Sequence, residues 1–337
     1  MTDAHDEEAA VQAPGRAETP VTSVTDVTST DTTVTGVSGM SGVTEVTEVT
    51  TEVTRLTGGA AEVTTVTEVT RRTRVPILMY HSVTDQPTPA TRPHAVRPAD
   101  FAAQMAYLKD GGFTPLTFAG LAAALEGGGP GLPARPIVIT FDDGYADFHT
   151  EALPVLDRHG FPCTVFVTSG WLDDAGAEAA GRPLDRMLTW SQVREAAAHG
   201  VEIAGHSHSH PQLDQIPRDM VRQELRRNKA LLEDRIGGAV TTMAYPYGYS
   251  SARVRREVRE AGYKAACAVN NAVAGDRHDL LAVPRLTVGR STTTARFRRA
   301  AEGRGVPLIY LKERTLTRGY AVVRRSRSGL GRLGSRV

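Results

Sequence analysis

Two adjacent carboxylates and a later pair of histidines are the residues of this sequence best suited to chemistry. Asp142 and Asp143 follow the apolar run 136–141, so they stand at the end of what the pattern predicts to be a buried strand. His206 and His210 come further along the chain, again after an apolar stretch. An aspartate with two histidines is a common ligand set for a catalytic divalent metal. The sequence therefore favours a hydrolase whose metal keeps one open coordination position.

Each of these signals also has a purely structural explanation when it is taken alone. An Asp-Asp-Gly sequence after a strand is a common turn, and histidines spaced His-x-x-x-His can form a surface cluster. Only their combination favours catalysis. Ser207 stands where the zincin signature has a glutamate, so a site of that kind is excluded. We expect Ser207 to orient the loop by hydrogen bonds and His208 to make no metal contact.

The two ends of the chain differ in charge, although the formal net charge is only +1. Residues 1–70 are rich in Thr, Val, Glu and Asp, and the triplet Glu-Val-Thr recurs within them. A three-residue period matches neither the strand nor the helix repeat, so we expect an acidic, disordered tail. Residues 296–337 form a basic tail that is rich in arginine. The segment between the tails, 71–295, is the predicted catalytic domain.

The sequence says little about binding partners or about the localisation of the protein. The basic tail can contact an anionic surface, but a solvated tail is the simpler expectation, and we expect no specific nucleic-acid binding. No stretch approaches the ~20 apolar residues of a membrane span. Residues 1–30 lack the basic start and apolar segment of a signal peptide, which leaves the localisation open.

The two cysteines, Cys163 and Cys267, each lie in an apolar, strand-like segment. This placement predicts buried thiols and argues against a disulfide framework or a thiolate metal site. The ligands of any metal must then be nitrogen and oxygen atoms.

Between the tails, strand candidates alternate with helical patterns. Strands are predicted at 75–80, 136–141, 163–168, 201–204, 241–245, 263–269 and 281–287. Helices are predicted at 99–109, 118–125, 145–159, 191–198, 218–235 and 252–261. This alternation indicates parallel strands with right-handed crossovers, in either a barrel or an open doubly wound sheet.

The candidate site residues fall where a barrel would place its chemistry, at the carboxyl ends of predicted strands. His81 ends the first strand, the aspartate pair ends the second, His206 follows the fourth and Tyr247 follows the fifth. Groups that are distant in sequence are thus expected to meet at one rim.

The order of these motifs resembles that of the polysaccharide deacetylase family, also called the NodB homology domain or carbohydrate esterase family 4. The resemblance spans about 75–290 and is carried by 140–145 (Thr-Phe-Asp-Asp-Gly-Tyr), 206–210 (His-Ser-His-Ser-His) and 245–248 (Tyr-Pro-Tyr-Gly). The segment 76–82 (Pro-Ile-Leu-Met-Tyr-His-Ser) further resembles the permuted branch that includes poly-N-acetylglucosamine deacetylases. The resemblance implies a distorted (β/α) barrel of about seven parallel strands.

The resemblance also implies roles for the site residues. Asp143, His206 and His210 would hold the metal, with zinc as the expected ion. Asp142 would be the general base, and His81 would protonate the departing amine.

Two tyrosines are implied near the substrate. A backbone amide near Tyr247 would stabilise the oxyanion. Tyr145 could line the sugar site or pack the helix that it opens.

The substrate implied by the resemblance is an N-acetylated sugar or polysaccharide, from which the enzyme would remove N-acetyl groups. Two alternatives stay open. The same site could hydrolyse an O-acetyl ester or a cyclic amide, and the protein could instead bind carbohydrate without catalysis.

The sequence departs from the family pattern at two places. Many members carry an arginine, just before the proline-tyrosine motif, that holds the base aspartate, but Ala244 and Tyr245 occupy that region here. We expect Arg285, in the last predicted strand, to reach the rim and replace it. The family's leucine-x-histidine motif is absent near the carboxyl end, so His81 must supply the acid.

Overall fold

The computed structural model describes residues 27–33, 39–41, 44–57, 60–127 and 131–316, with side chains described from residue 73 onward. The chain divides into two compact units, one of residues 1–37 and 47–70 and one of residues 38–46 and 71–337.

The segment that precedes the barrel contains paired strands. These are β1 (Val27–Thr33), β2 (Gly39–Ser41), β3 (Thr44–Thr57) and β4 (Ala60–Thr73). β1 and β2 pair antiparallel with β3, and β4 also pairs with β3. The described backbone of this segment is extended, which the abundant β-branched Thr and Val favour, and the disordered tail predicted for 1–70 stays a prediction. Residues 1–26 of that predicted tail lie outside the described residues, and its boundary at residue 70 stays a prediction.

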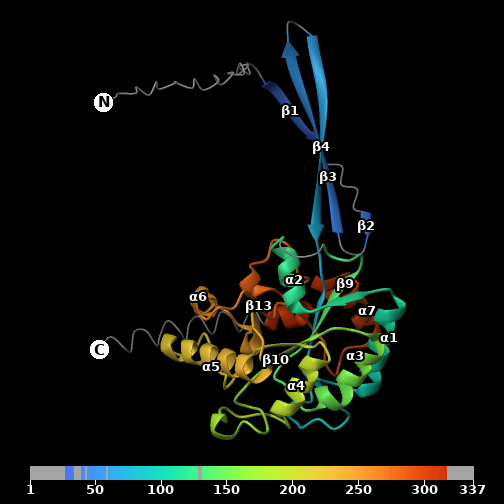
Figure 1. Ribbon diagram of the computed structural model, residues 1–337. Helices are drawn as coiled ribbons and strands as arrows, with labels where there is room; N and C mark the ends of the chain where they lie inside the picture. Colours follow the sequence, from blue (N-terminus) through green and yellow to red (C-terminus); the bar gives the residue numbers. More distant parts are fainter. Residues whose placement is uncertain (1–26, 34–38, 42–43, 58–59, 128–130, 317–337) are drawn as a thin grey trace, which may run out of the picture. The chain divides into compact units, whose positions relative to one another are not determined.

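Seven parallel strands form the sheet that organises the larger unit (Figure 1). In spatial order they are β14 (Leu286–Thr287), β5 (Ile77–Tyr80), β9 (Pro136–Phe141), β10 (Thr164–Val167), β11 (Glu202–Gly205), β12 (Thr242–Ala244) and β13 (Ala265–Cys267). Each is parallel to its neighbour, and a single parallel bridge from Cys267 to Val283 links β13 to the segment that leads into β14. The predicted distorted barrel of seven parallel strands is confirmed, in the form of a half-barrel.

One further strand joins this sheet, and two short strands form a separate two-stranded sheet. β8 (Thr114–Leu116) pairs with β9 in parallel, and β6 (Ser82–Val83) pairs with β7 (Ala95–Val96). Strands β5, β9 and β10 are buried along their whole length, as expected for parallel strands covered on both faces.

The helices surround the strands (Figure 1). They are α1 (Pro98–Asp110), α2 (Phe118–Leu125), α3 (Leu153–His159), α4 (Trp190–Ala198), α5 (Arg218–Ile236), α6 (Ala252–Glu260), α7 (Thr294–Ala301) and α8 (Val306–Ile309). The helix predicted over 145–159 is divided, because a π-helical turn, η1 (Phe148–Ala152), precedes α3. Three short 3-10 turns complete the set: η2 (Gly176–Glu178), η3 (Pro246–Gly248) and η4 (Leu280–Ala282). Within the described part of the chain, no helix combines the length and apolar character needed to cross a bilayer.

The beginning of the predicted basic tail is packed against the domain. Phe297, Val306 and Tyr310 are all buried, and Tyr310 Oη donates a hydrogen bond to the carbonyl oxygen of Thr287 in β14. The chain just beyond residue 295 is thus packed, and the domain boundary at 295 stays a prediction. Residues 317–337 lie outside the described residues, so the contact of the tail with an anionic surface stays a prediction.

Cys163 and Cys267 are both buried and free, as the sequence predicted.

Candidate metal centre

Three side chains converge at the carboxyl ends of β9 and β11. His206 Nε2 and His210 Nε2 lie 3.3 and 3.2 Å from Asp143 Oδ1. One ligand atom from each residue lies within 4.8 Å of the others. Asp143 Oδ1 is buried and has no hydrogen-bond partner among the described residues. A buried carboxylate oxygen left unsatisfied between two imidazole nitrogens is explained by a cation, and nitrogen and oxygen ligands of this kind suit zinc.

The ionisation of Asp143 and the orientation of the His206 ring both suit metal coordination. Burial alone would raise the pKa of Asp143, but His210 and His206 outweigh it and hold that pKa well below its usual range. Asp143 is therefore ionised at neutral pH. His206 Nδ1 lies 2.9 Å from the carbonyl oxygen of Ala244, to which it can only donate, so Nε2 of the neutral ring keeps its lone pair for a metal.

Strained backbone is concentrated around these residues. Among the described residues, four of the five non-glycine residues with positive φ belong to the site motifs: Asp143 at 74°, Ser207 at 64°, His210 at 61° and Tyr247 at 60°. Such conformations cost about 1 to 3 kcal/mol each and persist where the surrounding structure enforces them. Here the main-chain N–H of Thr168 donates to the carbonyl oxygen of Asp143 at 3.2 Å. The fold thus holds the ligands in place against local preference.

Asp142 lies beside the cluster and is held by a buried arginine. Arg285 Nη1 and Nη2 donate to Asp142 Oδ1 and Oδ2 at 2.5 and 2.7 Å, and Nη1 also donates to Thr140 Oγ1 at 3.2 Å. Burial would raise the pKa of Asp142, but Arg285 outweighs it and the net pKa is lowered. The predicted contact between Arg285 and the aspartate is therefore present, in bidentate geometry.

His81 lies at the end of β5 and interacts with the same charges. Its pKa is lowered to about 4, because burial disfavours the imidazolium more than Asp143 and Asp142 favour it. The ring of His94 lies 4.9 Å from that of His81, centroid to centroid. His81 Nδ1 is buried without a hydrogen-bond partner. The imidazole is thus neutral at physiological pH and able to accept a proton.

The two predicted tyrosines occupy different environments. Tyr247 is 54% exposed, and its ring centroid lies 4.8 Å from that of His210, so it stands at the open rim of the site. Tyr145 is only 3% exposed and packs with Trp171 and Met187. Burial and the charge of Asp143 raise the pKa of Tyr145, so its hydroxyl stays protonated. The side chain of Tyr145 is therefore buried and does not face solvent.

The loop 206–210 is arranged as predicted and has one support that the sequence did not reveal. Ser207 Oγ accepts a hydrogen bond from the main-chain N–H of His210 at 3.1 Å, and His208 Nδ1 lies 3.0 Å from Ser169 Oγ, so His208 has no part in the ligand cluster. The unforeseen support is Glu224 of α5, which accepts bonds from the main-chain N–H groups of His208 and Ser209 at 2.9 and 2.8 Å.

Asp147 is a second support that sequence reasoning missed. Its carboxylate accepts hydrogen bonds from Ser82 Oγ at 2.5 Å and from the main-chain N–H of Val83 at 3.0 Å, directly after His81. Neither Asp147 nor Glu224 lies in a recognisable pattern, since a carboxylate on a helix is ordinarily solvent-facing. In the sequence, the only sign of a role for Asp147 was its position close after Asp142 and Asp143.

Together these features define a parallel (β/α) half-barrel with a candidate metal site, formed by Asp143, His206 and His210, at the carboxyl ends of its strands. Residues 130–266 match the family model for polysaccharide deacetylase, and the match includes the aspartates and the histidine loop but not His81 or Arg285. Residues 130–266 therefore form a segment of polysaccharide deacetylase type.

Individual relatives agree with this assignment. The protein described as "Putative polysaccharide deacetylase YxkH" of Bacillus subtilis is 27% identical over 225 residues, which cover 66% of this chain and 75% of that protein. The poly-beta-1,6-N-acetyl-D-glucosamine N-deacetylase of Escherichia coli K12 is 34% identical over 136 residues, 39% of this chain but only 20% of that protein. Among solved structures, the deacetylase PplD of Streptococcus pyogenes in complex with acetate has a TM-score of 0.61 and 24% identity, covering 68% of this chain and 99% of that one. At that identity the likeness establishes the fold.

Proposed function

We propose that this protein is a metal-dependent hydrolase that removes N-acetyl groups from an N-acetylated polysaccharide. The observation that supports this most directly is the convergence of Asp143, His206 and His210 around an unsatisfied carboxylate oxygen, with a second carboxylate, Asp142, beside them. When bound, a zinc-like ion would polarise the amide carbonyl and make water more acidic.

Asp142 is proposed as the general base. Its lowered pKa keeps it ionised at neutral pH, so it can accept the proton of the attacking water. Arg285 engages both carboxylate oxygens, but each keeps another lone pair for that proton. Arg285 thus orients the base while leaving it able to act.

His81 is proposed as the group that delivers a proton to the departing amine. Because its pKa is about 4, the ring is neutral in the resting site and must first take up a proton during the reaction. Amines leave poorly as anions, so this transfer is needed for the bond to the acetyl carbon to break. Tyr145 is proposed to support the ligand Asp143 rather than to contact sugar.

The substrate is proposed to be a polymer or oligomer of N-acetylglucosamine. The Escherichia coli relative acts, by its name, on the β-1,6-linked polymer, and the segment 76–82 resembles the branch to which such enzymes belong. The exposed ring of Tyr247 offers an apolar face at the rim on which a sugar ring can pack. Its neighbouring backbone is the proposed source of oxyanion stabilisation.

Acetate release provides the test. The protein is incubated with β-1,6- and β-1,4-linked N-acetylglucosamine oligomers, before and after treatment with a chelator and after Zn²⁺ is restored. We expect release that is lost on chelation and recovered with the metal. Asp142→Asn should abolish release while keeping the metal, and Asp143→Ala should lose both.

The other outcomes separate the alternatives. Release only from O-acetylated sugars, or hydrolysis only of cyclic amides, would assign a different bond to the same site. Oligosaccharide binding without any turnover in the metal-loaded protein would instead indicate a carbohydrate-binding protein.

A further inference from the structure

Two loops that carry site residues leave the sheet from the adjacent parallel strands β11 and β12. The first contains His210 and leads into α5, and the second contains Tyr247 and leads into α6. The two rings lie 4.8 Å apart. The geometry of the site at this point therefore depends on how firmly one loop is held to the other.

His210 needs such support more than His206 does. His206 Nδ1 is anchored on the carbonyl oxygen of Ala244, whereas His210 Nδ1 is buried and has no hydrogen-bond partner. No second hydrogen bond orients the His210 ring, although such bonds ordinarily orient metal-binding histidines. Its position is left to ring contacts and to the backbone of its own loop.

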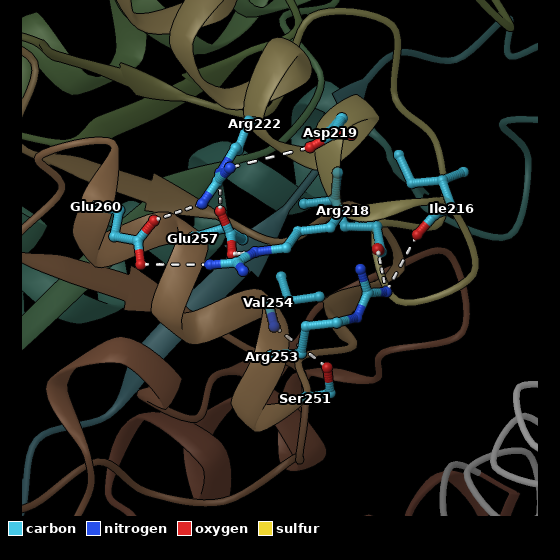
Figure 2. Close-up of polar contacts among 10 residues, drawn as sticks. Ile216, Arg218, Asp219, Arg222, Ser251, Arg253, Val254, Glu257 and Glu260 are labelled. Carbon is cyan, nitrogen blue, oxygen red and sulfur yellow. Dashed lines mark hydrogen bonds and ion pairs between the residues drawn. The ribbon is translucent and has the colours of Figure 1, made fainter.

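Arg253, in the first turn of α6, contacts the end of that loop (Figure 2). Its Nη2 donates to the carbonyl oxygens of Ile216, Asp214 and Leu213 at 3.1, 3.3 and 3.5 Å. A guanidinium is always charged and presents its donors in a fixed plane, so it can hold several carbonyls at once. This contact joins the helix that follows Tyr247 to the chain that follows His210.

An ion-pair cluster fixes the two helices to each other (Figure 2). The fully buried carboxylate of Glu257 pairs with the side chains of Arg218 and Arg222, the latter through a contact of 2.6 Å. Arg222 also pairs with Glu260 at 3.1 Å. These ion pairs stabilise the packing of α6 on α5, and Arg218, which also pairs with Glu260 at 3.5 Å, keeps both acidic residues paired if Arg222 is lost. Arg253 makes a separate contact between α6 and the loop.

We propose that Arg253 is a positioning residue for the metal ligand His210. It holds the segment 211–217 on α6, which sets the direction of the His210 ring toward Asp143 and its distance from Tyr247. Arg253 itself touches neither metal nor substrate. The inference rests on the proposed metal site.

Metal affinity tests the proposal without relying on turnover. Zn²⁺ affinity is measured by competition with a chelator, well below the unfolding temperature, for the parent protein and for Arg253→Met, Arg253→Lys, Arg256→Ala and Arg222→Ala. We expect Arg253→Met to lose about tenfold in affinity, as is typical when support of a metal ligand is removed. Amide hydrogen exchange in 211–217 should be faster in the same variant.

Matched variants distinguish positioning from general stability. Arg253→Lys keeps a charged donor and should recover most of the affinity. Arg256→Ala removes an exposed arginine of the same helix and should change nothing. Arg222→Ala breaks the ion pairs with Glu257 and Glu260, and should lower the unfolding temperature while the affinity is kept.

Two results would overturn the proposal: parent-like affinity in Arg253→Met, or an equal loss of affinity in Arg222→Ala. A parent protein that binds no divalent ion would overturn the proposed function itself, so the two failures are distinct.

Discussion

Replacing Arg285 by methionine tests the arrangement of the general base. The substitution keeps much of the side-chain volume but removes both donors to Asp142, which lie at 2.5 and 2.7 Å. Arg285 is 0% and Asp142 4% exposed, so water cannot replace the lost partner. Breaking a buried ion pair from one side typically costs about 3 to 5 kcal/mol, because the remaining charge is uncompensated. We expect a loss of that size in the free energy of unfolding at neutral pH.

Arg285→Met should also reverse the way in which the ionisation of Asp142 makes the free energy of unfolding depend on pH. In the parent the pKa of Asp142 is lowered, so its contribution to stability is complete above the unfolded value of about 3.9 and is lost as the pH falls through the lowered pKa. Without Arg285, burial dominates and raises that pKa. The loss of stability relative to the parent should then shrink as the pH falls, because Asp142 becomes protonated and neutral. For the same reason, the acid limb of the kcat/KM profile should move to higher pH.

Urea unfolding at several pH values and pH–rate profiles of acetate release measure both effects. The control is the double variant Arg285→Met with Asp142→Asn, in which no unpaired charge remains. It should regain most of the lost stability and stay inactive, since an amide cannot take the proton. An Arg285→Met protein with parent-like stability and an unmoved acid limb would refute the reasoning.

Two further predictions concern proton delivery and the support of the ligand loop. His81→Gln should lower kcat for the N-acetyl substrate by about 10²- to 10⁴-fold. It should lower kcat for an aryl acetate much less, because a phenolate leaves without a proton. Equal losses on both substrates would contradict the acid role. Gly170→Ala would bring a Cβ to 2.6 Å from the carbonyl oxygen of His208. The free energy of unfolding should therefore fall by about 1 to 3 kcal/mol, and the Zn²⁺ affinity should fall with it. Gly238→Ala, where a Cβ meets nothing within 4 Å, is the matched control, and similar behaviour of the two variants would exclude a steric cause.

Much of the barrel could be predicted from local patterns. Each of the seven predicted strands has a counterpart in the structure, because buried parallel strands consist of short, nearly continuous apolar runs. The candidate metal cluster could also be predicted from the sequence. Its ligands directly follow such strands, and parallel strands bring their carboxyl ends to one rim.

Other features depended on contacts that no local pattern records. The chain 145–159 shows one helical pattern, yet a π-helical turn precedes α3. Tyr145 follows the aspartates closely, but packing with Trp171 and Met187 turned it inward.

The amino-acid sequence by itself determined which groups could act and at which rim they would gather, since strand formation and ligand type are properties of short segments. Only the tertiary structure decided how those groups are held. Arg285 reaches Asp142, Glu224 supports the histidine loop, and Arg253 of α6 contacts the chain that follows His210. Such contacts depend on the distances between elements in three dimensions, and those distances are set by packing of the whole domain.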